Sequence, residues 1–239
     1  MADFADVSIQ MLVGSFGANP IIARLSVDMD SAVAVAVYAD AVQDQLEALD
    51  VVRRRGASVA LQVVPGVDTA AIQAWLGGYV YQEQAMSGPV ELTTVLADFF
   101  GENFSRVLVL TGDTPDYPAA LLIRALEELL HFDLVLGPAF GGGFHLLGFR
   151  RQGYRVDLLE MLPWVEPEGQ DVLWGRLAKV GVAVTFMPTW NRVEEIKDLN
   201  VLMRLNRQTS FVNSRTYQHL VEHEALIRQY DIDLSSPLS

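Results

Sequence analysis

Short runs of apolar residues alternate with longer segments of helical periodicity along most of the chain. The apolar runs, which are typical of buried strands, cover residues 9–14, 57–64, 79–84, 106–110, 133–136, 144–149 and 182–186. Helical spacing or composition between and after them predicts helices at 31–49, 68–75, 89–100, 118–130, 157–161, 170–180, 193–206 and 216–229. Such alternation is typical of a largely parallel sheet covered on both faces. We therefore expect an α/β fold, with a mostly parallel mixed sheet in a single three-layer αβα domain.

One of these segments is ambiguous, because the sequence AVAVAVY within residues 31–49 also alternates like a strand. Its length and its continuation through DAVQDQLEAL favour a helix. No internal repeat or long linker interrupts the chain. We expect one domain over residues 1–209, and a C-terminal helix and tail at 210–239 whose apolar positions are compatible with a homodimer.

Composition and net charge indicate which partners and which cellular compartment to expect. The chain has 239 residues, 51% of them hydrophobic, and a formal net charge of −13, with only two lysines against fifteen arginines. A chain this acidic is expected to repel nucleic acid and anionic membranes. No apolar run reaches the roughly 18 residues that a membrane span needs. The acidic N-terminus lacks the basic start of a signal peptide, and cysteine is absent, so we expect a cytoplasmic protein without disulfides or thiolate chemistry.

The segment from Arg106 to Pro118, RVLVLTGDTPDYP, carries the strongest functional signal. Its apolar run ends in Thr111-Gly112 and is followed by two acids, Asp113 and Asp116. Ligands of open α/β sheets bind outside the carboxyl ends of the strands, and paired carboxylates there hold Mg²⁺ or Mn²⁺ against substrate phosphates. The alternative is ordinary turn and capping chemistry, which also uses Asp and Pro.

Two glycine-containing segments are further candidates. Gly141 to Gly143 separates two predicted strands, and it indicates either close backbone approach to a ligand or a tight turn with positive φ. His145 follows it, as a cleft residue or a structural histidine. The loop from Gly14 to Arg24 follows the first strand, where phosphates bind in many α/β folds, although it matches no known phosphate-loop motif. Arg24 is either a phosphate ligand or a solvent-exposed arginine.

The region before the helix at 170–180 contains a tryptophan and two acids. Trp164 either stacks on a sugar or base or lies in the core, and Glu166 and Glu168 either act as a base or favour the helix N-terminus. His219 and His223 have a metal-compatible i, i+4 spacing. Without a clear third ligand, we interpret these two histidines as surface residues.

The chain resembles a bacterial family of nucleotide-diphospho-sugar transferase-like proteins with the glycosyltransferase-A fold, of the type associated with radical-SAM and selenoprotein systems. The resemblance lies in RVLVLTGDTPDYPAALLIRALEEL, DLVLGPAFGGGFHLLGFR, LPWVEPEGQDVLWGRLAKVGV and PTWNRVEEIKDLNVL. It implies a nucleotide-sugar ligand and a divalent metal at Asp113 and, less directly, Asp116. It further implies a donor site formed by Gly17, Arg24, Gly142, Gly143 and Trp164, to which the position of His145 in the following strand adds one more candidate.

The chain also departs from the family pattern around the implied site. Of the basic loop after the first strand only Arg24 remains, and Gly141 stands where an acid precedes the glycine pair. The acidic Asp-x-Asp-Thr segment becomes Arg192-Val193-Glu194-Glu195. Glu194 or Glu195 is a candidate replacement for a lost acid, and Arg192 for a phosphate-binding cation.

These observations leave three hypotheses. The first is a metal-assisted transfer of a sugar from a nucleotide diphosphate to an acceptor, with Glu166 or Glu194 as the catalytic base. The second is a nucleotidyltransferase on the same fold, although the loop after the first strand is poor in cations for a triphosphate. The third is a non-catalytic nucleotide-sugar-binding relative that has lost part of its site.

Overall fold

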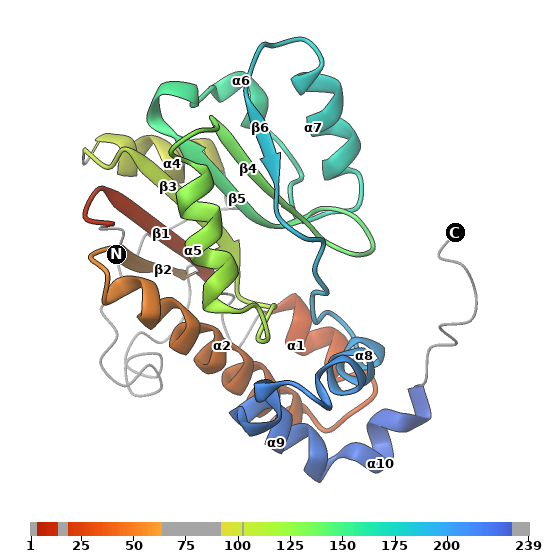
Figure 1. Ribbon diagram of the computed structural model, residues 1–239. Coiled ribbons are helices and arrows are strands. Elements are labelled where there is room, and N and C mark those ends of the chain that lie inside the picture. Colours follow the sequence, from red (N-terminus) through yellow and green to blue (C-terminus); the bar gives the residue numbers. More distant parts are fainter. Residues whose placement is uncertain (1–3, 14–18, 64–91, 102, 231–239) are drawn as a thin grey trace.

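The computed structural model describes residues 4–13, 19–63, 92–101 and 103–230, and a single mixed sheet forms its centre (Figure 1). Its strands are β1 (Val7–Val13), β2 (Ser58–Val63), β3 (Arg106–Thr111), β4 (Leu134–Pro138), β5 (Phe144–Arg150) and β6 (Val184–Phe186). They are arranged in the order β2-β1-β3-β5-β4-β6. β5 runs antiparallel to both of its neighbours, and the other pairs are parallel, which confirms the mostly parallel mixed sheet.

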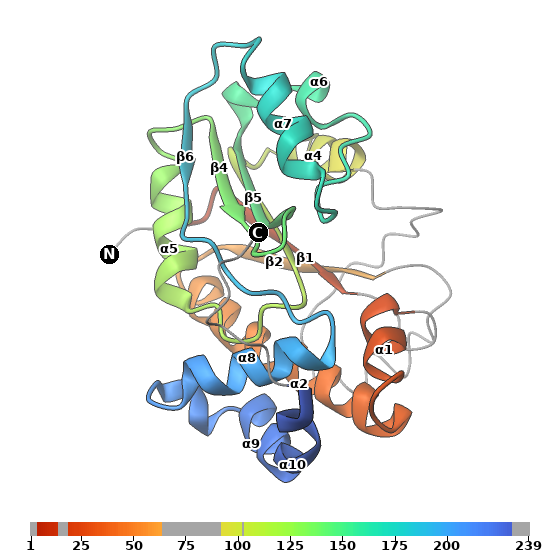
Figure 2. The ribbon, with the colours of Figure 1, turned by 90° about the vertical axis from the view of Figure 1, so that its right-hand side faces the viewer.

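Helices cover both faces of this sheet (Figures 1 and 2). They are α1 (Pro20–Leu25), α2 (Ser31–Arg53), α4 (Leu92–Gly101), α5 (Ala119–Glu128), α6 (Val156–Leu159), α7 (Gly169–Leu177), α8 (Ile196–Asn206), α9 (Arg215–Glu222) and α10 (Glu224–Ile227). Three short 3₁₀ turns are η1 (Arg151–Gly153), η2 (Ser210–Asn213) and η3 (Arg228–Tyr230). No helix among the described residues is both long enough and apolar enough to cross a bilayer.

The alternation of side chains along β3 produces two separate cores. Leu108 and Leu110 belong to a core shared with α1, α2, α5, α8, α9 and α10. Val107 and Val109 point to the opposite face, into a core shared with α4, α6 and α7. Because successive side chains of a strand point to opposite faces, a fully apolar run is what a strand covered on both sides requires. The three-layer prediction is thereby confirmed.

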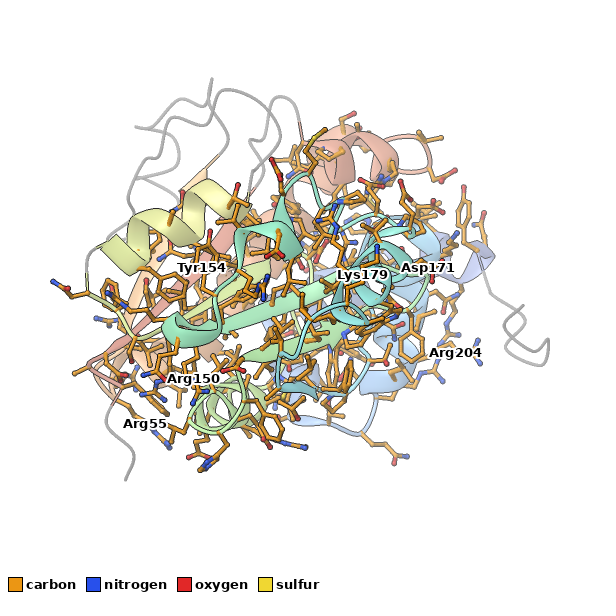
Figure 3. The ribbon with its side chains drawn as sticks, turned by 90° about the horizontal axis from the view of Figure 1, so that it is seen from above. Arg55, Arg150, Tyr154, Asp171, Lys179 and Arg204 are labelled. Atoms are coloured by element: carbon orange, nitrogen blue, oxygen red, sulfur yellow. The ribbon has the colours of Figure 1, made fainter. Side chains whose placement is uncertain are left out.

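Contacts of Tyr154 join the helical layer that contains α4 to the sheet. The side chain of Tyr154 lies beside α4 (Figure 3), and its hydroxyl donates a hydrogen bond of 3.0 Å to the Thr93 carbonyl. The same ring packs against Phe100 and Phe149, with centroid separations of 5.0 and 6.2 Å. This layer is therefore joined to β5 through the segment that follows the strand.

Most predicted elements agree with the structure, and the ambiguous segment is helical, as expected from its length. The sequence reading missed α1, which begins after Asn19, whose side-chain oxygen accepts hydrogen bonds from the amides of Ile21 and Ile22. The predicted last helix is divided at His223 into α9 and α10. The elements predicted at 68–75 and 79–84 lie outside the described residues.

The C-terminal helices pack on the domain rather than apart from it. The Asp44 carboxylate on α2 accepts hydrogen bonds from the backbone amides of Arg215 and Thr216 at the start of α9. Leu220 and Ile227 are fully buried in the first core. The boundary between 209 and 210, and the homodimer, remain predictions.

A pair of leucines near the end of α5 tests the assignment of the first core. Leu126→Ala removes a fully buried side chain and should lower the free energy of unfolding by about 2–5 kcal/mol. Leu130→Ala changes a side chain that is 51% exposed and should alter it by less than about 0.5 kcal/mol. Urea unfolding of both variants measures the difference, and equal losses would contradict the assignment.

Candidate functional site

The candidate site begins at the turn that follows β3. Gly112 is required there, because a Cβ at this position would lie 2.9 Å from the Leu12 carbonyl oxygen of β1. The amide of Gln45, on α2, donates to the Thr111 carbonyl at 2.8 Å and to the Thr114 hydroxyl at 2.9 Å. These contacts fix the backbone on both sides of Asp113.

The Asp113 carboxylate is buried in an ion pair with Arg192. Its Oδ2 accepts a hydrogen bond of 2.9 Å from Arg192 Nε, and its Oδ1 accepts one from the Thr111 hydroxyl. The side chains of Asp113 and Arg192 are only 2% and 10% exposed. The Val193 amide also donates to the Asp113 carbonyl at 2.8 Å, so two bonds join β3 to the segment before α8. Sequence analysis proposed Arg192 as a phosphate-binding cation but did not identify this partner, 79 positions away.

Arg192 has two further partners, which fix the orientation of its guanidinium group. Nη1 donates to the Val165 carbonyl at 2.6 Å and lies 2.9 Å from Glu194 Oε1. Burial acts to lower the pKa of Arg192, but the charges of Asp113 and Glu194 outweigh it and hold the pKa above the ordinary value. Arg192 is therefore a fixed positive charge at the carboxyl edge of the sheet.

Glu194 joins Arg192 to a second arginine. Its Oε2 lies 3.3 Å from Arg24 Nη2, and its backbone carbonyl accepts a bond of 3.4 Å from Arg24 Nε. Burial raises the pKa of the Glu194 carboxyl, while the two guanidinium groups act to lower it. The structure thus brings Arg24, Asp113 and Glu194 into one charge network through Arg192.

Asp116 does not share this network. Its Oδ1 accepts a hydrogen bond of 2.7 Å from Trp190 Nε1, and its Oδ2 accepts one of 2.7 Å from the side-chain amide of Asn206. Burial raises its pKa despite both bonds. Each carboxylate oxygen of Asp113 and Asp116 therefore accepts a hydrogen bond from a separate donor. A metal ion at this pair remains a prediction.

The glycine segment and Glu166 form the far wall of the site. Gly142 and Gly143 have φ of +100° and +68°, as the tight-turn alternative requires. A Cβ on Gly143 would meet the Val165 carbonyl oxygen at 2.6 Å. A small cavity of about 170 Å³ lies beside this turn. It is lined by Phe140, Gly141, Gly142, Val165, Glu166, Pro167, Arg192, Glu194, Glu195, Lys197 and Asp198.

Two predicted ligand residues lie in the interior instead. Trp164 is 4% exposed and belongs to the second core. His145 is 1% exposed, and burial lowers its pKa to about 3, so the ring is neutral at pH 7. Its ring packs against Tyr117 with centroids 4.7 Å apart. Their ligand-binding roles remain predictions, as does that of Gly17, which lies outside the described residues.

The described residues do contain one group suited to a metal ion, away from the sheet edge. His219 and Glu222 of α9, and His223 directly after it, offer ligand atoms that all lie within 4.8 Å of one another. Sequence analysis considered the two histidines but did not count Glu222, although its i+3 spacing from His219 was visible. In the described part of the chain, this clustering makes the end of α9 a possible position for a metal ion.

The fold is that of nucleotide-diphospho-sugar transferases and cytidylyltransferases. A Desulfovibrio desulfuricans protein provisionally assigned as a nucleotide-diphospho-sugar transferase is 32% identical, with a TM-score of 0.88 over 96% of this chain and 100% of its own. A Leptospira borgpetersenii cytidylyltransferase is 14% identical, with a TM-score of 0.58 over 95% and 98%. The T. maritima inositol-1-phosphate CTP transferase is 13% identical, with a TM-score of 0.53 over 97% and 100%. The last two similarities concern the fold alone.

The chain belongs to the family described as "Uncharacterized protein conserved in bacteria (DUF2064)", whose model matches residues 46–166. No curated protein matches the chain. The sequence resemblance to nucleotide-diphospho-sugar transferase-like proteins is confirmed by the Desulfovibrio structure. The matched segment includes β3 and Asp113 but ends before Arg192.

The buried ion pair yields a stability prediction. Arg192→Met leaves the Asp113 carboxylate buried without its cation, which should lower the free energy of unfolding by about 3–5 kcal/mol. The double variant Asp113→Asn/Arg192→Met should recover much of that loss in urea unfolding. Arg155→Met breaks an exposed pair with Asp157 and should leave the free energy of unfolding nearly unchanged, because water screens such a pair. Equal losses in the two single variants would contradict the importance of the buried pair.

The positive-φ turn can be tested with two glycines. Gly143→Ala places a side chain in left-handed backbone against Val165 and should cost at least about 1–3 kcal/mol in unfolding free energy. Gly175→Ala, in α7, meets nothing within 4 Å and should stabilise by about 0.5–1 kcal/mol. Thermal denaturation distinguishes them, and a neutral Gly143→Ala would show that the turn tolerates a side chain.

Proposed function

We propose that this protein binds a nucleotide-diphospho-sugar with its diphosphate between Arg24 and Arg192, and transfers the sugar to an acceptor. The supporting observation is that one carboxylate, that of Glu194, lies between these two guanidinium groups, at 3.3 and 2.9 Å. Guanidinium groups bind phosphate and carboxylate oxygens through the same charge-assisted hydrogen bonds. In this proposal, a phosphate of the donor takes the place of the Glu194 carboxylate.

The location of the arginines supports the same proposal. Arg192 is held at the end of β3 through Asp113, and Arg24 is on the helix that follows β1. β1 and β3 are adjacent parallel strands, and ligands of such sheets bind outside their carboxyl ends. Two cations from different segments can then meet one diphosphate.

The proposed chemistry needs no metal ion at Asp113, because the guanidinium groups supply the positive charge. The bond between the sugar's anomeric carbon and the diphosphate oxygen breaks, and the negative charge of the leaving diphosphate is stabilised by Arg24 and Arg192. The acceptor's hydroxyl oxygen bonds to the anomeric carbon, and its proton passes to Glu166. Glu166 is exposed and lines the same cavity as Arg192, which supports its role as the base.

Calorimetry with nucleotide-diphospho-sugars, with and without Mn²⁺, tests the binding site. We expect binding to be independent of Mn²⁺. Arg24→Gln should weaken it by roughly 10- to 100-fold, because a charge-assisted contact is lost. Glu194→Gln should tighten it, because the competing carboxylate loses its charge. Glu166→Gln should abolish transfer yet retain binding, whereas the neighbouring exposed Glu168→Gln should change neither.

Four outcomes would contradict the proposal in different ways. Binding that requires Mn²⁺ would instead support the hypothesis of metal-assisted transfer. A preference for nucleoside triphosphates over nucleotide sugars would favour the nucleotidyltransferase alternative. Binding with no transfer to any acceptor in a broad panel would favour the non-catalytic relative, and an absence of nucleotide binding would refute the ligand class itself.

A further inference from the structure

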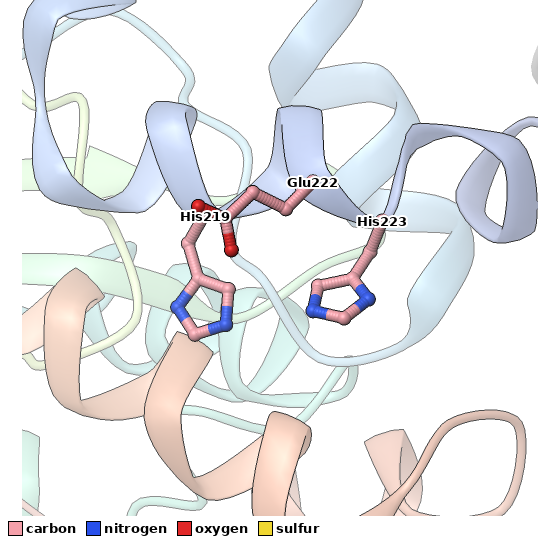
Figure 4. A group of neighbouring side chains, drawn as sticks. All are labelled: His219, Glu222 and His223. Atoms are coloured by element: carbon pink, nitrogen blue, oxygen red, sulfur yellow. The ribbon is translucent and has the colours of Figure 1, made fainter.

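A group of metal-compatible side chains lies at the C-terminal end of α9, in the helical layer that packs against α2. His219, Glu222 and His223 are turned toward one another (Figure 4), and their ligand atoms lie within 4.8 Å. His219 and His223 are partly exposed and Glu222 is exposed, so an ion can reach them from solvent. We propose that these three side chains bind one Zn²⁺ ion.

The ligand set favours zinc. His219 and Glu222 are three residues apart and share one face of α9, and His223, the residue that ends this helix, brings its ring to the same place. Two imidazole nitrogens and one carboxylate oxygen form a ligand set found at zinc sites that keep the fourth position for water or another ligand. Mg²⁺ prefers oxygen ligands and several waters, so a site with two imidazoles discriminates against it.

A contact between His219 and a carboxylate of α2 provides independent support. Nδ1 of His219 lies 2.8 Å from Asp40 Oδ2, on α2. This contact places the ring proton on Nδ1 and leaves Nε2 available as a metal ligand, the arrangement by which a carboxylate orients a ligating histidine. The imidazole rings of His219 and His223 are 5.4 Å apart between centroids and inclined by 37°.

The charge around the group is also suitable for a cation. Asp40 and Glu222 are both carboxylates, and the nearby Arg215 is paired with Asp44 and Glu47. An ion at this position connects α9, through His219, to Asp40 on α2. The site is therefore a link between the C-terminal helices and the domain, and it shares no residue with the proposed diphosphate site.

Competition with a chromophoric zinc chelator tests this proposal on the full-length, metal-stripped protein. We expect one Zn²⁺ per chain and no binding of Mg²⁺ by calorimetry. His223→Ala and Glu222→Gln should each weaken zinc binding at least about 10-fold, and Asp40→Asn should weaken it roughly 10- to 100-fold by releasing the ring of His219. His131→Ala removes an exposed histidine outside the group and should leave binding unchanged.

Thermal denaturation supplies a second readout. Because the ligands come together only in the folded chain, Zn²⁺ should raise the Tm of the wild-type protein and of His131→Ala, but not that of His219→Ala/His223→Ala. Circular dichroism establishes that the double variant is folded. The proposal fails if the wild-type protein cannot compete with the chelator, if the double variant binds zinc equally well, or if half an equivalent binds with formation of a dimer.

Discussion

The buried ion pair between Asp113 and Arg192 is the constraint on which the rest of the site depends. A charge that is removed from water requires an opposite charge and hydrogen bonds in return. Asp113 obtains these from Thr111 and Arg192, and Arg192 from the Val165 carbonyl and Glu194. The pair thereby joins the end of β3 to the segments that precede α7 and α8. These segments are distant in the sequence, yet none of them can move without exposing or isolating a charge.

This constraint also determines what chemistry the edge of the sheet can perform. The sequence resemblance implies an acid at the position that Arg192 occupies in this chain. Here the arginine itself supplies the positive charge, and Arg24 adds a second through Glu194. The carboxylates of Asp113 and Glu194 balance the two guanidinium groups, so the network is neutral as it stands. The diphosphate that we propose as ligand would therefore have to displace the Glu194 carboxylate, because both guanidinium groups are already paired with it.

The sequence was informative where structure follows from local patterns, and less so where it follows from distant contacts. The apolar runs located the six described strands because a strand buried on both faces needs apolar residues at successive positions. α1 was not predicted, because it has only six residues and its main sequence signal is the N-cap residue Asn19. Asp113 and Asp116 looked equivalent in sequence, but Trp190 and Asn206 engage Asp116 from segments more than 70 positions away. Such pairings are absent from a single sequence, so the site could be located but not assembled.

α2 connects this site with the proposed zinc position. Gln45, on α2, holds the turn that carries Asp113, and its neighbour Asp44 accepts hydrogen bonds from the first amides of α9. Asp40, about one turn earlier on the same helix, contacts His219. A metal ion on α9 would therefore act on the same two turns of α2 that support the end of β3. Zinc would stabilise the docking of α9 without touching a ligand at the sheet edge, so any effect on diphosphate binding would have to pass through the position of α2.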